Sequence, residues 1–117
     1  MAERILQLAV EGEYFHAMLT GEKPEEYREV TPYWIRRLEG KTFDRVILTW
    51  GYPSKTDLRR RIELPFVGIV RKTITHKHFD DRTLEVFAIQ LGERENWFIW
   101  KEAYAATIRH FENLQNA

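Results

Sequence analysis

The 117-residue sequence contains no cysteine, no long apolar segment and no excess of charge of either sign. The lack of cysteine excludes a disulfide framework and thiolate chemistry, and it fits a reducing environment. No apolar run approaches the ~20 residues that a membrane-spanning helix requires, and the first residues do not have the layout of a signal peptide. We therefore expect a soluble cytoplasmic protein that does not associate with a membrane.

The formal net charge is zero, which argues against a protein that coats nucleic acid indiscriminately. The charges are nevertheless unevenly distributed, because residues 59–82 carry seven basic and three acidic side chains while the segments on either side are slightly acidic. A basic segment in a neutral protein can attract phosphates, since local patches set the local field. The alternative is a solvated loop that keeps a strand edge soluble.

A chain of this length forms one domain with a substantial core. Its hydrophobic periodicity predicts an α+β fold, in which a small curved or closed sheet is flanked by helices. The expected main body covers residues 1–95, and an aromatic-rich helix capped by Asn96 covers residues 96–117 and packs on the same body. We expect strands at 4–10, 25–30, 43–50, 62–77 and 84–92, and helices at 11–21 and 31–40.

The segment GEKPEEYR, residues 21–28, is unusually dense in charge. Side chains alternate along an extended segment, so Glu26 and Arg28 share one face and Lys23 approaches from the preceding turn. Arg28 offers a planar donor fork, Glu26 accepts from an exocyclic amine, and Lys23 supplies a point charge or an amine whose pKa Arg28 lowers. The segment therefore predicts a polar binding site with Lys23 and Glu26 as candidate catalytic groups. The alternative is an ion-pair cluster that attaches the strand to a helix.

Further candidates follow the next strand. Trp50 and Tyr52 flank a glycine at the end of that strand, where an aromatic ring can stack on a base or simply belong to the core. Arg59, Arg60 and Arg61 can contact phosphates, which position a nucleic acid without reading its sequence. The segment THKHFDDR offers only two histidines on one strand face, so we expect neither a metal site nor any other cofactor.

The pattern Gly21-x-Lys23-x-x-Glu26-x-Arg28 matches the G-x-K-x-x-E-x-R signature of the ASCH (activating signal cointegrator homology) domain family. The EEYREVTPYWIRRL run, the WGY after the next strand and the closing VFAIQLGE also resemble small bacterial and prophage-type members. The resemblance covers roughly residues 4–93 and leaves the C-terminal helix outside. It implies a fold similar to the PUA domain, a small β-barrel found in RNA-modifying proteins.

The resemblance implies RNA or nucleotide binding in a charged cleft, with Gly21 and Arg28 in the ligand site. Some members of the family resemble amidohydrolases that deacetylate N4-acetylcytidine with a lysine, a threonine and a glutamate. Lys23 matches that lysine, whereas Glu26 occupies the position of the threonine. We therefore expect a binding module for RNA or a nucleotide. The alternative is a small amidohydrolase of acylated nucleosides with Lys23 as base or nucleophile.

Overall fold

The fold was obtained as a computed structural model that describes residues 2–115. The strands of this part of the chain are β1 (Ile5–Val10), β2 (Glu25–Glu29), β3 (Arg45–Trp50), β4 (Arg61–Pro65), β5 (Ile69–Thr75) and β6 (Thr83–Gln90). Its α-helices are α1 (Gly12–Thr20), α2 (Pro32–Leu38) and α3 (Lys101–Gln115), and short 3₁₀ turns occupy Leu58–Arg60, Lys77–Phe79 and Arg94–Asn96. The predicted α+β class is therefore confirmed.

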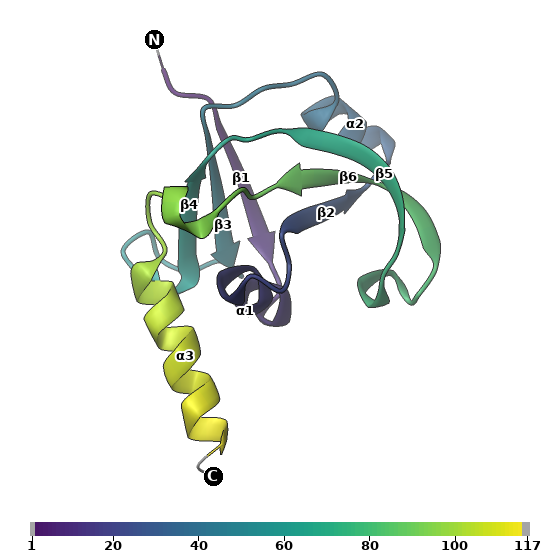
Figure 1. Cartoon of the computed structure of the whole chain (residues 1–117). Coiled ribbons are helices and arrows are strands. Elements are labelled where there is room, and N and C mark those ends of the chain that lie inside the picture. Colours follow the sequence, from purple (N-terminus) through teal and green to yellow (C-terminus); the bar gives the residue numbers. More distant parts are fainter. Residues whose placement is uncertain (1, 116–117) are drawn as a thin grey trace.

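The strands form two three-stranded sheets whose strands run across one another (Figure 1). In one sheet β3 lies between β1, which is parallel to it, and β4, which is antiparallel. In the other, β6 lies between β2 and β5, and both pairs are antiparallel. Helix α1 connects β1 to β2, so the first two strands of the chain belong to different sheets. This crossing brings the end of β1 close to β2.

Within residues 2–115 the two sheets do not close into the expected barrel. The chain leaves the first sheet at Pro65, the last residue of β4, and enters the second at Ile69, the first residue of β5. Proline has no N–H to donate to a neighbouring strand, so it ends the ladder. The long strand predicted at 62–77 is consequently two strands in different sheets, and residues 66–68 connect them.

The core lies between the sheets and under α1. Leu6 and Leu8 of β1 pair with Val46 and Leu48 of β3, and all four side chains are buried. Phe15 of α1 is also fully buried in this cluster. Burial of each such side chain stabilises the fold by about 1.5–3 kcal/mol. The two sheets are thus held against α1, which fixes where the segment after α1 enters β2.

Each short helix has a cap at the end that adjoins β2, at a residue within the predicted helix range. Gly21 adopts a left-handed conformation with φ of 86° and ends α1, where its N–H donates to the Met18 carbonyl at 3.3 Å. Thr31 caps α2 by accepting from the Trp34 N–H at 3.3 Å, and Pro32 occupies the first helical position. These two caps bracket β2. Its place and direction are therefore determined from both sides.

The C-terminal helix begins later than predicted, at Lys101, and Asn96 does not cap it. Asn96 instead ends a 3₁₀ turn, and the next residues run along β4, where the Phe98 N–H donates to the Glu63 carbonyl and the Glu63 N–H to the Ile99 carbonyl. These bonds with a strand edge outweigh the helical pattern of the segment. Helix α3 then extends away from the sheets, with its C-terminal half projecting beyond α1 (Figure 1). None of the described helices is both long and apolar enough to cross a membrane.

Candidate functional site

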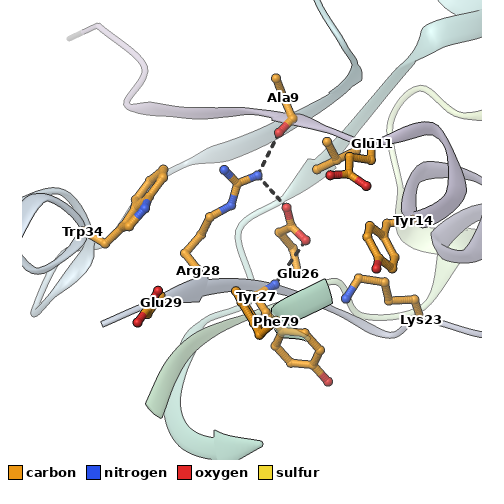
Figure 2. A pocket seen from close by; sticks show the side chains of 11 residues that line it. Ala9, Glu11, Tyr14, Lys23, Glu26, Tyr27, Arg28, Glu29, Trp34 and Phe79 are labelled. Carbon is orange, nitrogen blue, oxygen red and sulfur yellow. Dashed lines mark hydrogen bonds and ion pairs between the residues drawn. The ribbon is translucent and has the colours of Figure 1, made fainter. Parts of the chain in front are cut away.

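A cleft of about 320 Å³ lies where the end of β1 meets β2. Figure 2 shows Glu26 and Arg28 of β2 pointing into it, with the rings of Trp34 and Tyr14 on either side. We call this space the cleft and define it by its lining residues: Ala9, Val10, Glu11, Tyr14, Lys23, Glu26, Tyr27, Arg28, Glu29, Trp34 and Phe79. All three members of the predicted Lys23, Glu26 and Arg28 trio therefore line one cavity.

Arg28 holds the two sheets together at the cleft. Its Nη2 donates to Glu26 Oε2 at 2.5 Å and to the carbonyl of Ala9, on β1, at 2.8 Å (Figure 2). Its guanidinium carbon lies 5.1 Å from the ring centroid of Trp34. Its Nε, by contrast, is buried and has no hydrogen-bond acceptor among the described residues. A buried N–H without an acceptor is costly, and such groups are rare outside sites with a special role.

Glu26 is held on two sides. Besides its ion pair with Arg28, it accepts from the Tyr27 N–H through Oε1 at 3.1 Å. The Glu26 side chain is only 8% exposed. The prediction that Glu26 and Arg28 share a face of β2 is confirmed by this contact. The alternative was an ion-pair cluster that attaches the strand to a helix. The ion pair instead forms within β2, and a hydrogen bond from Arg28 to Ala9 attaches β2 to β1.

Lys23 is buried to 8% exposure and makes no ion pair with a carboxylate of the described chain. Its Nζ lies 4.0 Å from the ring centroid of Tyr27 and 5.3 Å from that of Tyr14. Burial lowers the Lys23 pKa, and the charges of Glu26 and Glu25 partly oppose that shift. The expectation that Arg28 lowers this pKa is confirmed, although the loss of solvent contributes more than Arg28 does. The amine is thus moved toward its neutral form.

Tyr27 links the cleft to a structural network on the other side of β2. Its hydroxyl donates to Glu25 Oε1 at 2.9 Å, and Glu25 also accepts from Lys72 and Gln90. Burial, followed by the hydrogen bond to Glu25, raises the pKa of Tyr27 to about 12. The ring beneath Lys23 is therefore a neutral phenol held in one orientation.

The other predicted site residues lie outside the cleft. Gly21 ends α1, and the N–H of Lys23 donates to the Ala17 carbonyl at 3.1 Å, so the glycine positions the lysine through the backbone. Trp50 packs between the ring of His16 (4.9 Å) and the guanidinium of Arg60 (4.2 Å). Tyr52 is 95% exposed in the following loop.

The three arginines after that loop differ from one another. Arg61 Nε donates to Glu63 Oε2 at 2.6 Å, and both side chains are largely buried. Arg59 and Arg60 are exposed and share a single carboxylate, that of Asp57, at 3.1 and 4.0 Å. One carboxylate cannot balance two guanidinium groups. Arg59 and Arg60 therefore leave a local positive charge at the surface, whereas Arg61 belongs to the structure.

Tyr14, Trp34 and Glu11 line the cleft but were not predicted as site residues. Tyr14 and Trp34 lie on the inward faces of α1 and α2, and a helical pattern alone does not distinguish a core ring from a cleft ring. Glu11 directly follows β1 and joins the site only because β1 and β2 belong to different sheets. Among the side chains that the structure describes, no group of three or more His, Asp or Glu is arranged to hold a metal ion.

Comparisons with known proteins assign neither a family nor a function to this chain. The chain matches none of the protein families, curated proteins or solved structures with which it was compared. The geometry of the cleft and its surroundings is therefore the basis for a functional proposal.

Proposed function

We propose that the cleft binds the base of a nucleoside or nucleotide, either free or within RNA. The observation that supports this most directly is the convergence of Lys23, Glu26 and Arg28 on one cavity whose sides are aromatic. A volume of about 320 Å³ is at the lower end of the range for small-molecule sites and suits a single base. The resemblance of residues 4–93 to the ASCH domain family supports the same ligand class and a PUA-like fold. The lack of cysteine supports a cytoplasmic location.

The chemistry of the cleft favours a base over a phosphate. Its carboxylates, Glu11, Glu26 and Glu29, outnumber its two cations, Lys23 and Arg28. A phosphate would be repelled by this excess of negative charge. An exocyclic amine and a ring carbonyl, in contrast, find carboxylate acceptors and guanidinium or ammonium donors in one place. Tyr27 and Trp34 provide ring faces for stacking.

Titration calorimetry with the four ribonucleosides and their monophosphates tests the proposal. We expect binding of at least one, and an approximately tenfold or greater loss in Arg28→Lys, because lysine keeps the charge but loses the planar donor fork. Arg36→Lys is the matched control, since Arg36 is exposed on α2 and does not line the cleft. If no nucleoside binds, or if the two variants behave alike, the cleft is not a nucleoside site.

A second function, hydrolysis of an N-acylated nucleoside, is favoured by one observation. Lys23 is buried, has no ion pair and has a lowered pKa, as a lysine that acts as a base requires. In such a reaction the neutral amine takes a proton from water and the water oxygen attacks the acyl carbon. The carbon–nitrogen bond then breaks, and the departing exocyclic amine receives the proton. Glu26 can assist only if its ion pair with Arg28 opens.

Incubation of the protein with N4-acetylcytidine and other N-acylated nucleosides, followed by chromatography, separates the two functions. Hydrolysis that disappears in Lys23→Met while the variant stays folded would establish the enzyme, and Glu26→Gln would then test the proton partner. Nucleoside binding without any product would leave a binding module and exclude hydrolysis of these substrates.

A further inference from the structure

A second and larger cavity adjoins the cleft. Its volume is about 750 Å³, and it lies between α1, the 3₁₀ turn after β5 and the projecting half of α3. We call this space the groove. The rings along it come from Tyr14, Tyr27, Trp50 and Phe111, with the imidazoles of His16, His76 and His110. Aromatic rings at this density suit the flat face of a nucleobase.

The cleft and the groove share a wall. Tyr14, Lys23 and Tyr27 line both cavities. Because only these side chains separate the two cavities, a ligand longer than one nucleoside can reach from the cleft past the Lys23 amine to the groove. Because the Lys23 ammonium lies at this boundary with no carboxylate partner, it can face the phosphate that joins two neighbouring nucleosides.

The C-terminal helix forms the far wall of the groove. Thr107 of α3 is buried and its hydroxyl shares a hydrogen bond with His16 Nδ1 of α1 at 2.7 Å. One turn further on, the rings of His16 and His110 are stacked with centroids 5.9 Å apart. Burial and the neighbouring His110 lower the pKa of His16, which favours a neutral ring in this stack. Residues 4–93 carry the family resemblance, so this wall is an addition outside it.

The groove opens toward the two surface arginines. A third cavity of about 190 Å³ contains Arg59 and Arg60 and shares His16, Trp50 and His110 with the groove. The Arg60 guanidinium covers one ring, that of Trp50, at 4.2 Å. Two carboxylates line the groove itself, and one of them, Glu13, is paired with Lys77. The charge along the route thus changes from negative in the cleft to positive at Arg59 and Arg60.

We propose that this protein binds single-stranded RNA of at least two nucleotides, with one base in the cleft and the next base in the groove. This inference rests on the proposed function of the cleft. The sugar–phosphate backbone passes Lys23 and continues toward Arg59 and Arg60, where the uncompensated positive charge lies. Rings and cations that alternate along adjoining cavities are the arrangement by which proteins bind single strands. The C-terminal helix is therefore part of the binding surface.

The test compares ligands of different length by titration calorimetry. The probes are adenosine, cytidine and uridine monophosphates and the corresponding RNA homo-oligomers of two and four nucleotides. We expect at least one dinucleotide to bind about tenfold more tightly than its mononucleotide, which is the effect of one additional stacked base. Phe111→Ala and, separately, His110→Ala should remove that gain and leave mononucleotide affinity unchanged. Both side chains are exposed enough for the helix to tolerate their loss.

Leu114→Ala is the matched control, because Leu114 is exposed on the same helix and lies outside the groove. Leu114→Ala should change neither the mononucleotide affinity nor the dinucleotide affinity. The inference is overturned if dinucleotides bind no better than mononucleotides, or if the gain with length survives in Phe111→Ala and His110→Ala. In that case mononucleotide binding that depends on Arg28 would leave the cleft proposal intact. If no probe binds and Arg28→Lys is indistinguishable from the unmodified protein, both proposals fail.

Discussion

Lys23 is a cation that folding removes from water without giving it a carboxylate partner. Its pKa is lowered from the ordinary value of 10.5, so the folded protein holds fewer protons than the unfolded chain between the two pKa values. Stability therefore increases with pH through that window and the increase is complete above pH 10.5. We predict that Lys23→Met abolishes this dependence, since the variant has no amine to deprotonate. Urea unfolding at a series of alkaline pH values measures it.

The comparison needs a control for the loss of one positive charge. Lys101→Met provides it, because Lys101 is exposed at the start of α3 and does not line the cleft. If Lys23→Met and the unmodified protein gain stability in parallel as the pH rises, the buried amine is not the source. The lysine would then remain charged in the folded state, and its use as a base in hydrolysis would lose its support.

Tyr27 makes the stability of the fold change with pH in the opposite direction, because it lowers stability at high pH. Its pKa of about 12, against an ordinary value of 10.0, favours the neutral phenol in the folded state. The associated stability is present below pH 10 and is lost as the pH rises through about 12. We predict that alkaline titration of tyrosinate absorbance contains a late step that Tyr27→Phe removes. Tyr52→Phe, which replaces an exposed tyrosine, should leave that step in place; its disappearance there would contradict the assignment.

At the scale of elements, the turn from α1 into β2 determines where Lys23 lies. Gly21 has a φ of 86° and no heavy atom within 4 Å of the position of an added Cβ. Gly21→Ala therefore tests the backbone alone, and we predict a loss of about 1–2 kcal/mol in the free energy of unfolding. Because the turn also anchors the Lys23 N–H to Ala17, ligand affinity should fall as well. Chemical denaturation and calorimetry measure the two effects.

Gly40 offers a matched comparison for this prediction. It also has a left-handed conformation, with a φ of 67°, and open space around its Cβ position, but it follows α2 and lies outside the cleft. Gly40→Ala should cost similar stability while leaving ligand affinity unchanged. Equal losses of affinity in both variants would show that general destabilisation, and not the position of Lys23, is responsible.

The elements that could be predicted from the sequence are those whose signals are local. The cap at Thr31, the end of α1 at Gly21 and the alternation along β2 depend on residues within a few positions, and the structure has all three. The start of α3 could not be predicted in this way. Residues 97–99 have helical spacing, yet Phe98 and Ile99 bond to Glu63, more than thirty residues earlier in the chain. Pairing with a strand edge that is distant in the chain produces no signal in the local sequence of residues 97–99.

At the scale of the whole molecule, one part of the site follows from local sequence signals and the rest depends on contacts between segments distant in the chain. The order of charges after Gly21 indicated one side of the cleft, because that side is a single strand. The other side comes from the end of β1, which approaches β2 only because the chain divides its strands between two crossing sheets. The backbone carbonyl of Ala9 accepts from Arg28. Every residue type has such a carbonyl, so the identity of residue 9 could not predict this role. Likewise, the contact between His16 and Thr107 depends on the path of α3.

The distribution of charge over the molecule leads to a prediction about salt. Arg59 and Arg60 share Asp57 and retain an excess positive charge. Arg61 shares Glu63 with Arg45, but Arg45 also pairs with Glu3, so two carboxylates balance these two arginines. If Arg59 and Arg60 contact the RNA backbone, each releases counterions, and the slope of log affinity against log salt changes by about 0.7 per phosphate for a single strand. The double variant Arg59→Gln, Arg60→Gln should therefore bind a tetranucleotide more weakly and with a slope smaller by up to about 1.4, twice the single-phosphate value.

Arg61→Gln separates this effect from a change in fold. Arg61 donates to Glu63 at 2.6 Å in a largely buried pair, so its replacement should lower the free energy of unfolding by about 1–3 kcal/mol. Because Arg61 faces Glu63 and not the solvent, the salt slope should stay that of the unmodified protein. Calorimetry across a series of salt concentrations measures both slopes. An unchanged slope in the double variant would mean that the RNA backbone leaves the groove by another route, since the positive charge at Arg59 and Arg60 would then contact no phosphate.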